Sequence, residues 1–264
     1  MEKMKEAYAK LYRAVFGEGH MKYKEEEVCS FVAMKGSEYD NQDEVRFMLV
    51  GRATNGWGKI LSTDSEQAFS SDAKARLREI NRFEKEWKMK DCKGNPYSEY
   101  KDKDGNIKKY FLSHSRFWNY SREVWERITD VKHKPDWFNC ITWSNIYKIA
   151  PEESGNPSTN LIFAQAESCV EILKEEIKIL KPTHILLVID EGWIAWKSRK
   201  KCFNFMEAFE DYEECNAAVT KNQCIVQRAL KKGKTKVLVT CRPENRKKEE
   251  YVNEVVNAFA LLEK

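Results

Sequence analysis

A proline between a long helical pattern and a short apolar run constrains the fold of this chain most. Residues 159–180 carry apolar side chains at helical spacing, and Pro182 then prevents the helix from continuing. Residues 184–189 read His-Ile-Leu-Leu-Val-Ile, an almost unbroken apolar run. Such a run is typical of a strand that is buried on both faces, as in a parallel sheet. The pattern therefore predicts a helix followed by a buried strand.

Three further segments have the same alternation of short apolar runs with amphipathic stretches, and we expect strands at residues 46–50, 139–144 and 237–240. Helical spacing predicts the intervening helices at residues 4–15, 77–87, 117–128, 159–180, 203–230 and 251–262. We expect one α/β domain over residues 1–264, a three-layer α/β/α sandwich around a central, mainly parallel four-stranded sheet. Residues 88–109 are rich in Lys, Asp and Gly and indicate a charged, solvated insertion.

Charge and hydropathy limit where the chain works and what it binds. It has 46 Lys and Arg against 42 Asp and Glu, so a nucleic-acid-binding face would have to be local. The first ten residues are too charged for a signal peptide, and the longest apolar run, residues 185–189, is too short to span a bilayer. We expect a cytoplasmic protein, without a membrane partner, that is a monomer.

The eight cysteines include no Cys-x-x-Cys pair. We expect reduced thiols rather than a metal centre, with Cys140, Cys169 and Cys241 as small buried hydrophobic residues. His114, His133 and His184 have no partner at ligand spacing, and we assign them to a helix cap, a turn and a strand start. No metal or other cofactor is expected.

The residues that follow the four predicted strands are polar, and this is where an open parallel sheet binds its ligands. The exits are residues 51–58, 145–148, 190–193 and 242–246. Gly, Asn, Asp and Pro occur at many strand ends simply because they turn the chain. Four exits that each add an aromatic, amide or cationic group favour a shared pocket. The glycine-rich exit has neither the P-loop ending nor the dinucleotide-binding spacing.

The order of these motifs resembles the uracil-DNA glycosylase superfamily. The resemblance is carried by Phe117-Trp118 at a helix start, the strand that ends in Asn145, the segment 155–158, and Leu180-Lys181-Pro182. The loop from Gly51 falls where the family has its first catalytic loop, and Arg242-Pro243 falls where it has His-Pro-Ser. The resemblance covers residues 47–259 without the insertion.

The resemblance implies hydrolysis of the N-glycosidic bond of a base flipped out of DNA. Asn145 matches the amide that reads the base, and its side chain offers both a donor and an acceptor. The base-binding residues implied in this way are Gly51, Arg52, Tyr110, Phe111 and Asn145. Phe111 also fits a core aromatic ahead of a helix. The implied DNA contacts are Lys148, Trp193 and Arg246.

Two catalytic positions depart from the family pattern. Arg52 and Ala53 stand where the family positions water with Asp, Asn or Glu, which leaves Asn55 for that role. Arg242 replaces the histidine that stabilises the departing base, and a guanidinium stabilises an anion without exchanging a proton.

Basic clusters at residues 197–201, 231–236 and 246–248 fit either a phosphate-tracking groove, with Trp57, Trp193 and Trp196 as stacking platforms, or ordinary surface charge. Three hypotheses remain open. The first is a DNA glycosylase for uracil or another deaminated or mismatched base. The second is a catalytically silent relative that binds nucleic acid or a nucleotide. The third is a protein-interaction module that kept only the fold.

Overall fold

The computed structural model describes residues 2–16, 28–42, 44–53, 97–101, 105–111, 114–132, 134, 136–151, 155–197, 202–220 and 224–263. The predicted helix at residues 77–87, the candidate Asn55, Trp57 and most of the basic cluster 197–201 lie outside the described residues.

Four parallel strands form the centre of the sheet, as predicted. They are β3 (Phe47–Gly51), β6 (Ile141–Asn145), β8 (His184–Val188) and β13 (Thr235–Thr240). β3 pairs in parallel with β6 on one side and with β8 on the other, and β8 pairs in parallel with β13. The backbone positions of Gly51 and Asn145 are therefore directly opposite each other. All four strands place their carboxyl ends at the same edge of the sheet.

The sheet is larger than the four strands predicted, because antiparallel strands extend it at both sides. These are β2 (Met34–Lys35), β11 (Glu213–Glu214) and β12 (Val226–Lys232), which complete the seven-stranded order β11-β12-β13-β8-β3-β6-β2. The helix predicted at residues 203–230 is therefore wrong. The described part of that segment contains β10 (Cys202–Asn204), β11, most of β12 and the short 3-10 helices η6 (Phe205–Phe209) and η7 (Asn216–Ala218).

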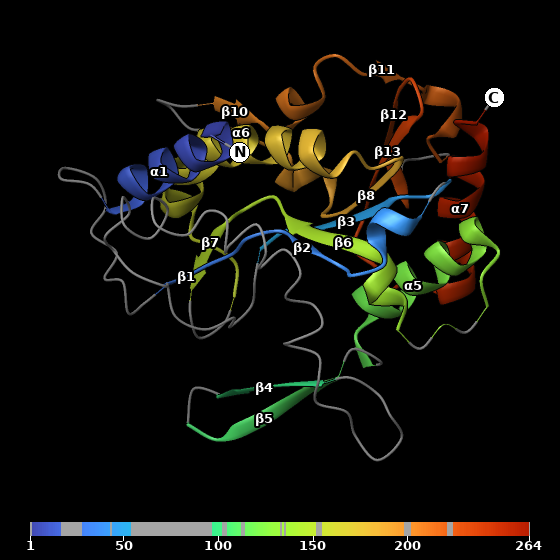
Figure 1. The fold of residues 1–264 in the computed structure, drawn as a ribbon, viewed down its shortest axis with the longest axis horizontal. Coiled ribbons are helices and arrows are strands. Elements are labelled where there is room, and N and C mark those ends of the chain that lie inside the picture. Colours follow the sequence, from blue (N-terminus) through green and yellow to red (C-terminus); the bar gives the residue numbers. More distant parts are fainter. Residues whose placement is uncertain are drawn as a thin grey trace.

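Helices cover both faces of the sheet (Figure 1). They are α1 (Glu2–Phe16) and α6 (Thr159–Leu180) on one face and α5 (Arg116–Thr129) and α7 (Lys248–Leu261) on the other. Side chains alternate along each strand, so Met48 and Val50 pack toward α1 and α6 whereas Phe47 and Leu49 pack toward α5 and α7. The sheet thus separates two apolar cores.

The ends of α6 explain why the predicted helix and strand boundaries there are accurate. The Ser158 side chain accepts a hydrogen bond from the Leu161 backbone N–H at 3.3 Å and caps the start. Lys181 adopts a left-handed conformation, with φ of 48°, and closes the helix ahead of Pro182. The chain then enters β8 directly.

Three smaller pairs of strands lie outside the central sheet. β1 (Val28–Ser30) pairs with β7 (Ile149–Pro151), β9 (Ala195–Lys197) with β10, and β4 (Tyr97–Lys101) with β5 (Ile107–Phe111). The last pair contains the described part of the predicted insertion and projects away from the body of the molecule in Figure 1. Ile107, Lys108 and Lys109 are exposed there.

Cys140, Cys169 and Cys241 are buried and carry unbridged thiols, which confirms their assignment as small core residues. Burial raises the pKa of the Cys169 thiol to about 12, and Glu176 acts in the same direction while Lys148 opposes it, so this thiol stays protonated. Within the described ranges, no helix has both the length and the apolar character needed to cross a membrane.

Candidate functional site

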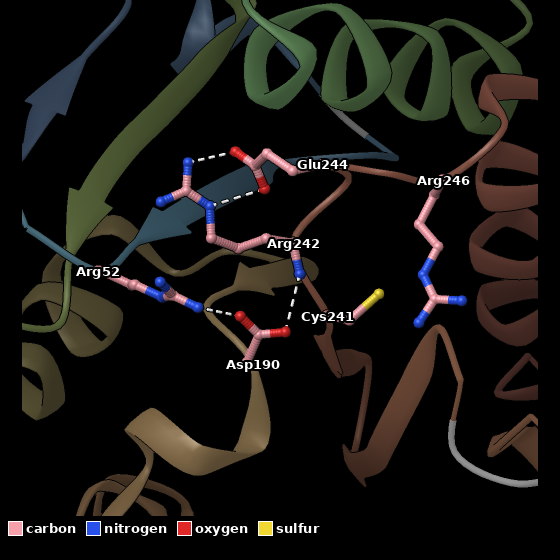
Figure 2. Close-up of a pocket in the computed structure, with 6 residues that line it drawn as sticks. All are labelled: Arg52, Asp190, Cys241, Arg242, Glu244 and Arg246. Carbon is pink, nitrogen blue, oxygen red and sulfur yellow. Dashed lines mark hydrogen bonds and ion pairs between the residues drawn. The ribbon is translucent and has the colours of Figure 1, made fainter.

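A pocket of about 530 Å³ opens at the carboxyl edge of the parallel strands. The four parallel strands lie side by side in the order β6-β3-β8-β13. The chain therefore leaves β3 toward one edge of the sheet, to β6, and leaves β8 toward the other edge, to β13. A crevice forms at such a reversal, and ligands of open α/β sheets bind there. The pocket is lined by Arg52, Asp190, Cys241, Arg242, Glu244 and Arg246, which follow β3, β8 and β13 (Figure 2).

Arg52 is the best anchored cation of the pocket. Its Nε donates to the backbone carbonyl of Ile189 at 2.7 Å, and its Nη2 forms an ion pair with Asp190. The guanidinium carbon also lies 4.6 Å from the ring centroid of Trp193, a cation–π contact. Burial lowers the pKa of Arg52, and the nearby Arg242 charge acts in the same direction while Asp190 opposes it. The sequence-predicted residues Arg52 and Trp193 are thus in direct contact.

Asp190 joins two strand exits through one carboxylate. One oxygen pairs with Arg52, and the other accepts the backbone N–H of Arg242 at 3.1 Å. Asp190 has φ of 64° and ψ of 142°, a conformation that side-chain-bearing residues rarely adopt. Strained residues persist where surrounding contacts fix them, and they cluster at functional sites. Asp190 was recognised in the sequence only as a strand-exit residue.

Arg242 is held by Glu244, two residues further along the chain. Its Nε donates to one carboxylate oxygen at 2.9 Å and its Nη2 pairs with the other, a side-on bidentate contact visible in Figure 2. The side chains are 36% and 46% exposed. The residue that the resemblance implies as the anion stabiliser therefore lies in the pocket, where a carboxylate of the chain occupies its fork.

Arg246 and Cys241 form the remaining wall of the pocket. Burial raises the pKa of the Cys241 thiol, while the neighbouring Arg246 acts in the opposite direction. The backbone carbonyl of Arg246 accepts a hydrogen bond from the Tyr120 hydroxyl of α5 at 2.9 Å, which ties this turn to the helical layer. Arg246 itself is exposed.

Asn145 lies at the same edge of the sheet but does not line this pocket. Its side chain is 1% exposed and leans over Gly51, where a Cβ atom would be only 2.5 Å from Asn145 Oδ1. A side chain at position 51 would therefore displace the Asn145 amide. Asn145 Nδ2 is buried and finds no hydrogen-bond partner among the described residues. A buried amide donor in this position is costly unless another group satisfies it.

The burial of Lys148 disagrees with the DNA contact that was expected of this residue. Its side chain is fully buried, and Nζ contacts Glu176 Oε1 at 2.7 Å and Ser144 Oγ at 2.7 Å. Gln165 of α6 accepts the backbone N–H of Lys148 at 3.0 Å. The ammonium therefore points into the core under α6 and cannot reach a phosphate. The sequence shows that Lys148 follows a strand, but not toward which face its side chain turns.

Two other base-binding candidates belong to the projecting hairpin. Tyr110 and Phe111 end β5, and the Phe111 ring lies 5.1 Å from the His114 ring. Phe111 is not among the described residues that line the pocket. Asn55, the candidate for positioning water, lies outside the described residues.

The structure adds three residues to the site that sequence reasoning did not select, namely Asp190, Cys241 and Glu244. The strand exits were the signal that located Asp190 and Glu244, but ordinary turn chemistry explained them equally well. Across the described part of the chain, no group of three or more His, Cys, Asp or Glu side chains is arranged to hold a metal ion. A comparison of the sequence with protein-family models and with curated proteins found no match.

Proposed function

We propose that this protein binds a nucleotide unit of a nucleic acid, with the phosphate in the pocket at the carboxyl edge of the sheet. The observation that carries this proposal is that Arg52, Arg242 and Arg246 all line one pocket of about 530 Å³. Guanidinium groups bind phosphate oxygens through paired, charge-assisted hydrogen bonds. The position at the reversal of strand order supports a ligand site independently of charge.

Groups for a base lie near the cations. Trp193 follows β8 and presents an aromatic ring that already stacks on the Arg52 guanidinium. Stacking on aromatic and guanidinium planes is how proteins hold single bases without reading their identity. The unsatisfied Nδ2 of Asn145 lies at the same sheet edge but is buried outside the pocket, so it could donate to an acceptor oxygen of a base only if the base displaces the groups that cover it.

Fluorescence anisotropy with labelled single- and double-stranded oligonucleotides tests the proposal. Binding should weaken steeply with salt, by roughly 0.7 to 0.9 in log affinity per unit log salt for each phosphate contacted. Arg52→Ala and Arg242→Ala should each reduce affinity, whereas Arg13→Ala should not. Arg13 is an exposed cation of α1, outside the pocket, so it controls for net charge. Salt-independent binding, or equal loss in all three variants, would favour the protein-interaction hypothesis.

A second candidate function is hydrolysis of the N-glycosidic bond of uracil or another deaminated or mismatched base. The buried amide of Asn145 over Gly51 favours it, because the family resemblance assigns base reading to Asn145. With this function we propose a three-layer α/β/α sandwich related to the uracil-DNA glycosylase superfamily. Negative charge that develops on a leaving base would be stabilised by Arg242 once its guanidinium turns from Glu244 to the substrate.

Single-turnover cleavage of oligonucleotides that contain uracil, hypoxanthine, xanthine or mismatched thymine tests this second function. Arg242→Ala should lower the cleavage rate about 10²-fold, the effect of losing one preorganised electrostatic group. Asn145→Asp should change which base is accepted, because it exchanges a donor for a charged acceptor. If the unmodified protein binds DNA but leaves every base intact, the catalytically silent hypothesis stands alone.

A further inference from the structure

The two carboxylates of the pocket are held very differently. Asp190 is fixed by contacts from two strand exits, and its partner Arg52 is only 15% exposed. Glu244 contacts Arg242 from two residues away, on an exposed turn after β13. Asp190 is thus a built-in part of the site. Glu244 has the freedom to leave.

The Arg242–Glu244 ion pair is weak because both side chains are exposed to solvent, although its geometry is bidentate. Ion pairs with both side chains about this exposed contribute little free energy, because water screens the charges and both side chains lose rotamer freedom. A phosphate in the same fork would carry up to two negative charges and more acceptor oxygens. An incoming phosphate group therefore competes with Glu244 at small cost.

The charge of the pocket depends on where Glu244 lies. Among the described residues that line the pocket, three guanidinium groups stand against two carboxylates while Glu244 is in place, an excess of one positive charge. When Glu244 turns out to solvent, Arg52, Arg242 and Arg246 stand against Asp190 alone, an excess of two. That excess matches a dianionic terminal phosphate rather than a singly charged internal phosphodiester.

We propose that Glu244 is a displaceable stand-in for the ligand, and that the group which displaces it from Arg242 is the terminal phosphomonoester of a nucleotide or an oligonucleotide. This inference rests on the proposed nucleotide-binding function and names the phosphate and the specificity residue. Glu244 keeps weaker anions out of the fork, since only a ligand that gains more from Arg242 than Glu244 does can enter.

Binding of three probes at constant ionic strength tests this inference: thymidine 5′-monophosphate, an oligonucleotide with a 5′-phosphate, and the same oligonucleotide with a 5′-hydroxyl. The unmodified protein should prefer the 5′-phosphate over the 5′-hydroxyl oligonucleotide. Glu244→Gln should tighten binding of the phosphate-bearing probes roughly two- to five-fold, the worth of an exposed ion pair. Arg242→Ala should abolish the preference for the terminal phosphate.

Glu250→Gln is the matched control, because it removes the same charge from an exposed position in the first turn of α7, outside the pocket. Equal affinities of the Glu244 and Glu250 variants would overturn the stand-in role while leaving nucleic-acid binding intact. Equal affinity of the protein for 5′-phosphate and 5′-hydroxyl oligonucleotides would overturn the choice of phosphate. Failure of every probe to bind would instead reject the proposed function itself. Binding of the mononucleotide at an affinity close to that of the phosphorylated oligonucleotide would identify the terminal phosphate as the main determinant and support the inference.

Discussion

Lys148 and Asp190 are charged residues that follow β6 and β8, two strands whose carboxyl ends lie at the same edge of the sheet, yet their environments differ. Lys148 is fully buried against Glu176, whereas Asp190 lines the pocket beside Arg52. The difference arises from direction, since β6 leads its exit under α6 and β8 leads its exit into the crevice. At the residue scale, local sequence specifies a strand end but not the environment of the side chain.

The buried Lys148–Glu176 pair should be much more sensitive to losing one partner than to losing both. Lys148→Met leaves the Glu176 carboxyl buried without its ammonium, and we expect a loss of about 3–5 kcal/mol in the free energy of unfolding. The double variant Lys148→Met with Glu176→Met should recover most of that loss. Urea unfolding of the two variants and of Glu176→Met alone measures the effect. A double variant as unstable as the sum of the single ones would show that the two charges do not act as a pair.

His184 should make the protein less stable at acidic pH. It is 4% exposed, and burial lowers its pKa from 6.5 to about 4, with the Lys236 charge acting in the same direction and Glu263 opposing it. Between these values the unfolded chain binds a proton that the folded protein does not, so stability falls as pH falls. The contribution is about 2–3 kcal/mol.

Chemical unfolding at pH 7 and pH 4.5 measures this contribution of His184. The difference between the two pH values should be smaller in His184→Gln than in the unmodified protein, because Gln does not titrate. An identical pH difference in both proteins would contradict the role of His184.

At the scale of elements, the sequence pattern predicted a helix at residues 203–230, whereas residues 226–232 form the strand β12. Its residues Val-Gln-Arg-Ala-Leu-Lys-Lys include several good helix formers, and a register shift between Val226 and Arg228 breaks the strict alternation expected of a strand. Pairing with β13 overrides this preference. The turn at Gly233, with φ of 55°, completes the hairpin.

Gly36 should be required for the edge strand β2 to dock. A Cβ atom there would overlap the backbone carbonyl of Asn139, at the start of the segment that leads into β6. Because backbone cannot give way as a flexible side chain can, Gly36→Ala should destabilise the protein by roughly 1–3 kcal/mol or more. Gly192→Ala is the control, since a Cβ atom at Gly192 meets nothing within 4 Å. Comparable thermal unfolding of both variants would contradict the predicted clash.

At the scale of the whole molecule, stability should be concentrated in the central strands. β3 and β8 are buried along their length and bonded to a strand on each side, while β4 and β5 pair only with each other in the described structure. Amides of β3 and β8 should exchange hydrogen only through global unfolding. Amides of the β4–β5 hairpin should exchange through local opening, orders of magnitude faster. Equal protection in both regions, measured by mass spectrometry, would contradict this division.

The sequence by itself determined the four parallel strands and the boundary between α6 and β8. These depend on properties of neighbouring residues, namely apolar periodicity, a capping Ser158 and the missing N–H of Pro182. It also predicted a pocket at the strand exits, because parallel strands bring their carboxyl ends to one edge, although the exit after β6 contributes none of the described lining residues.

Only the tertiary structure decided which exit residues meet and which charged residues form ion pairs. Lys148 meets Glu176 across 28 residues, and Arg52 meets Asp190 across 138. Such pairs depend on how separate strands and helices are placed in space, and no local pattern encodes that placement. The antiparallel strands β2 and β11 were decided in the same way, because their hydrogen-bond partners lie on other segments of the chain.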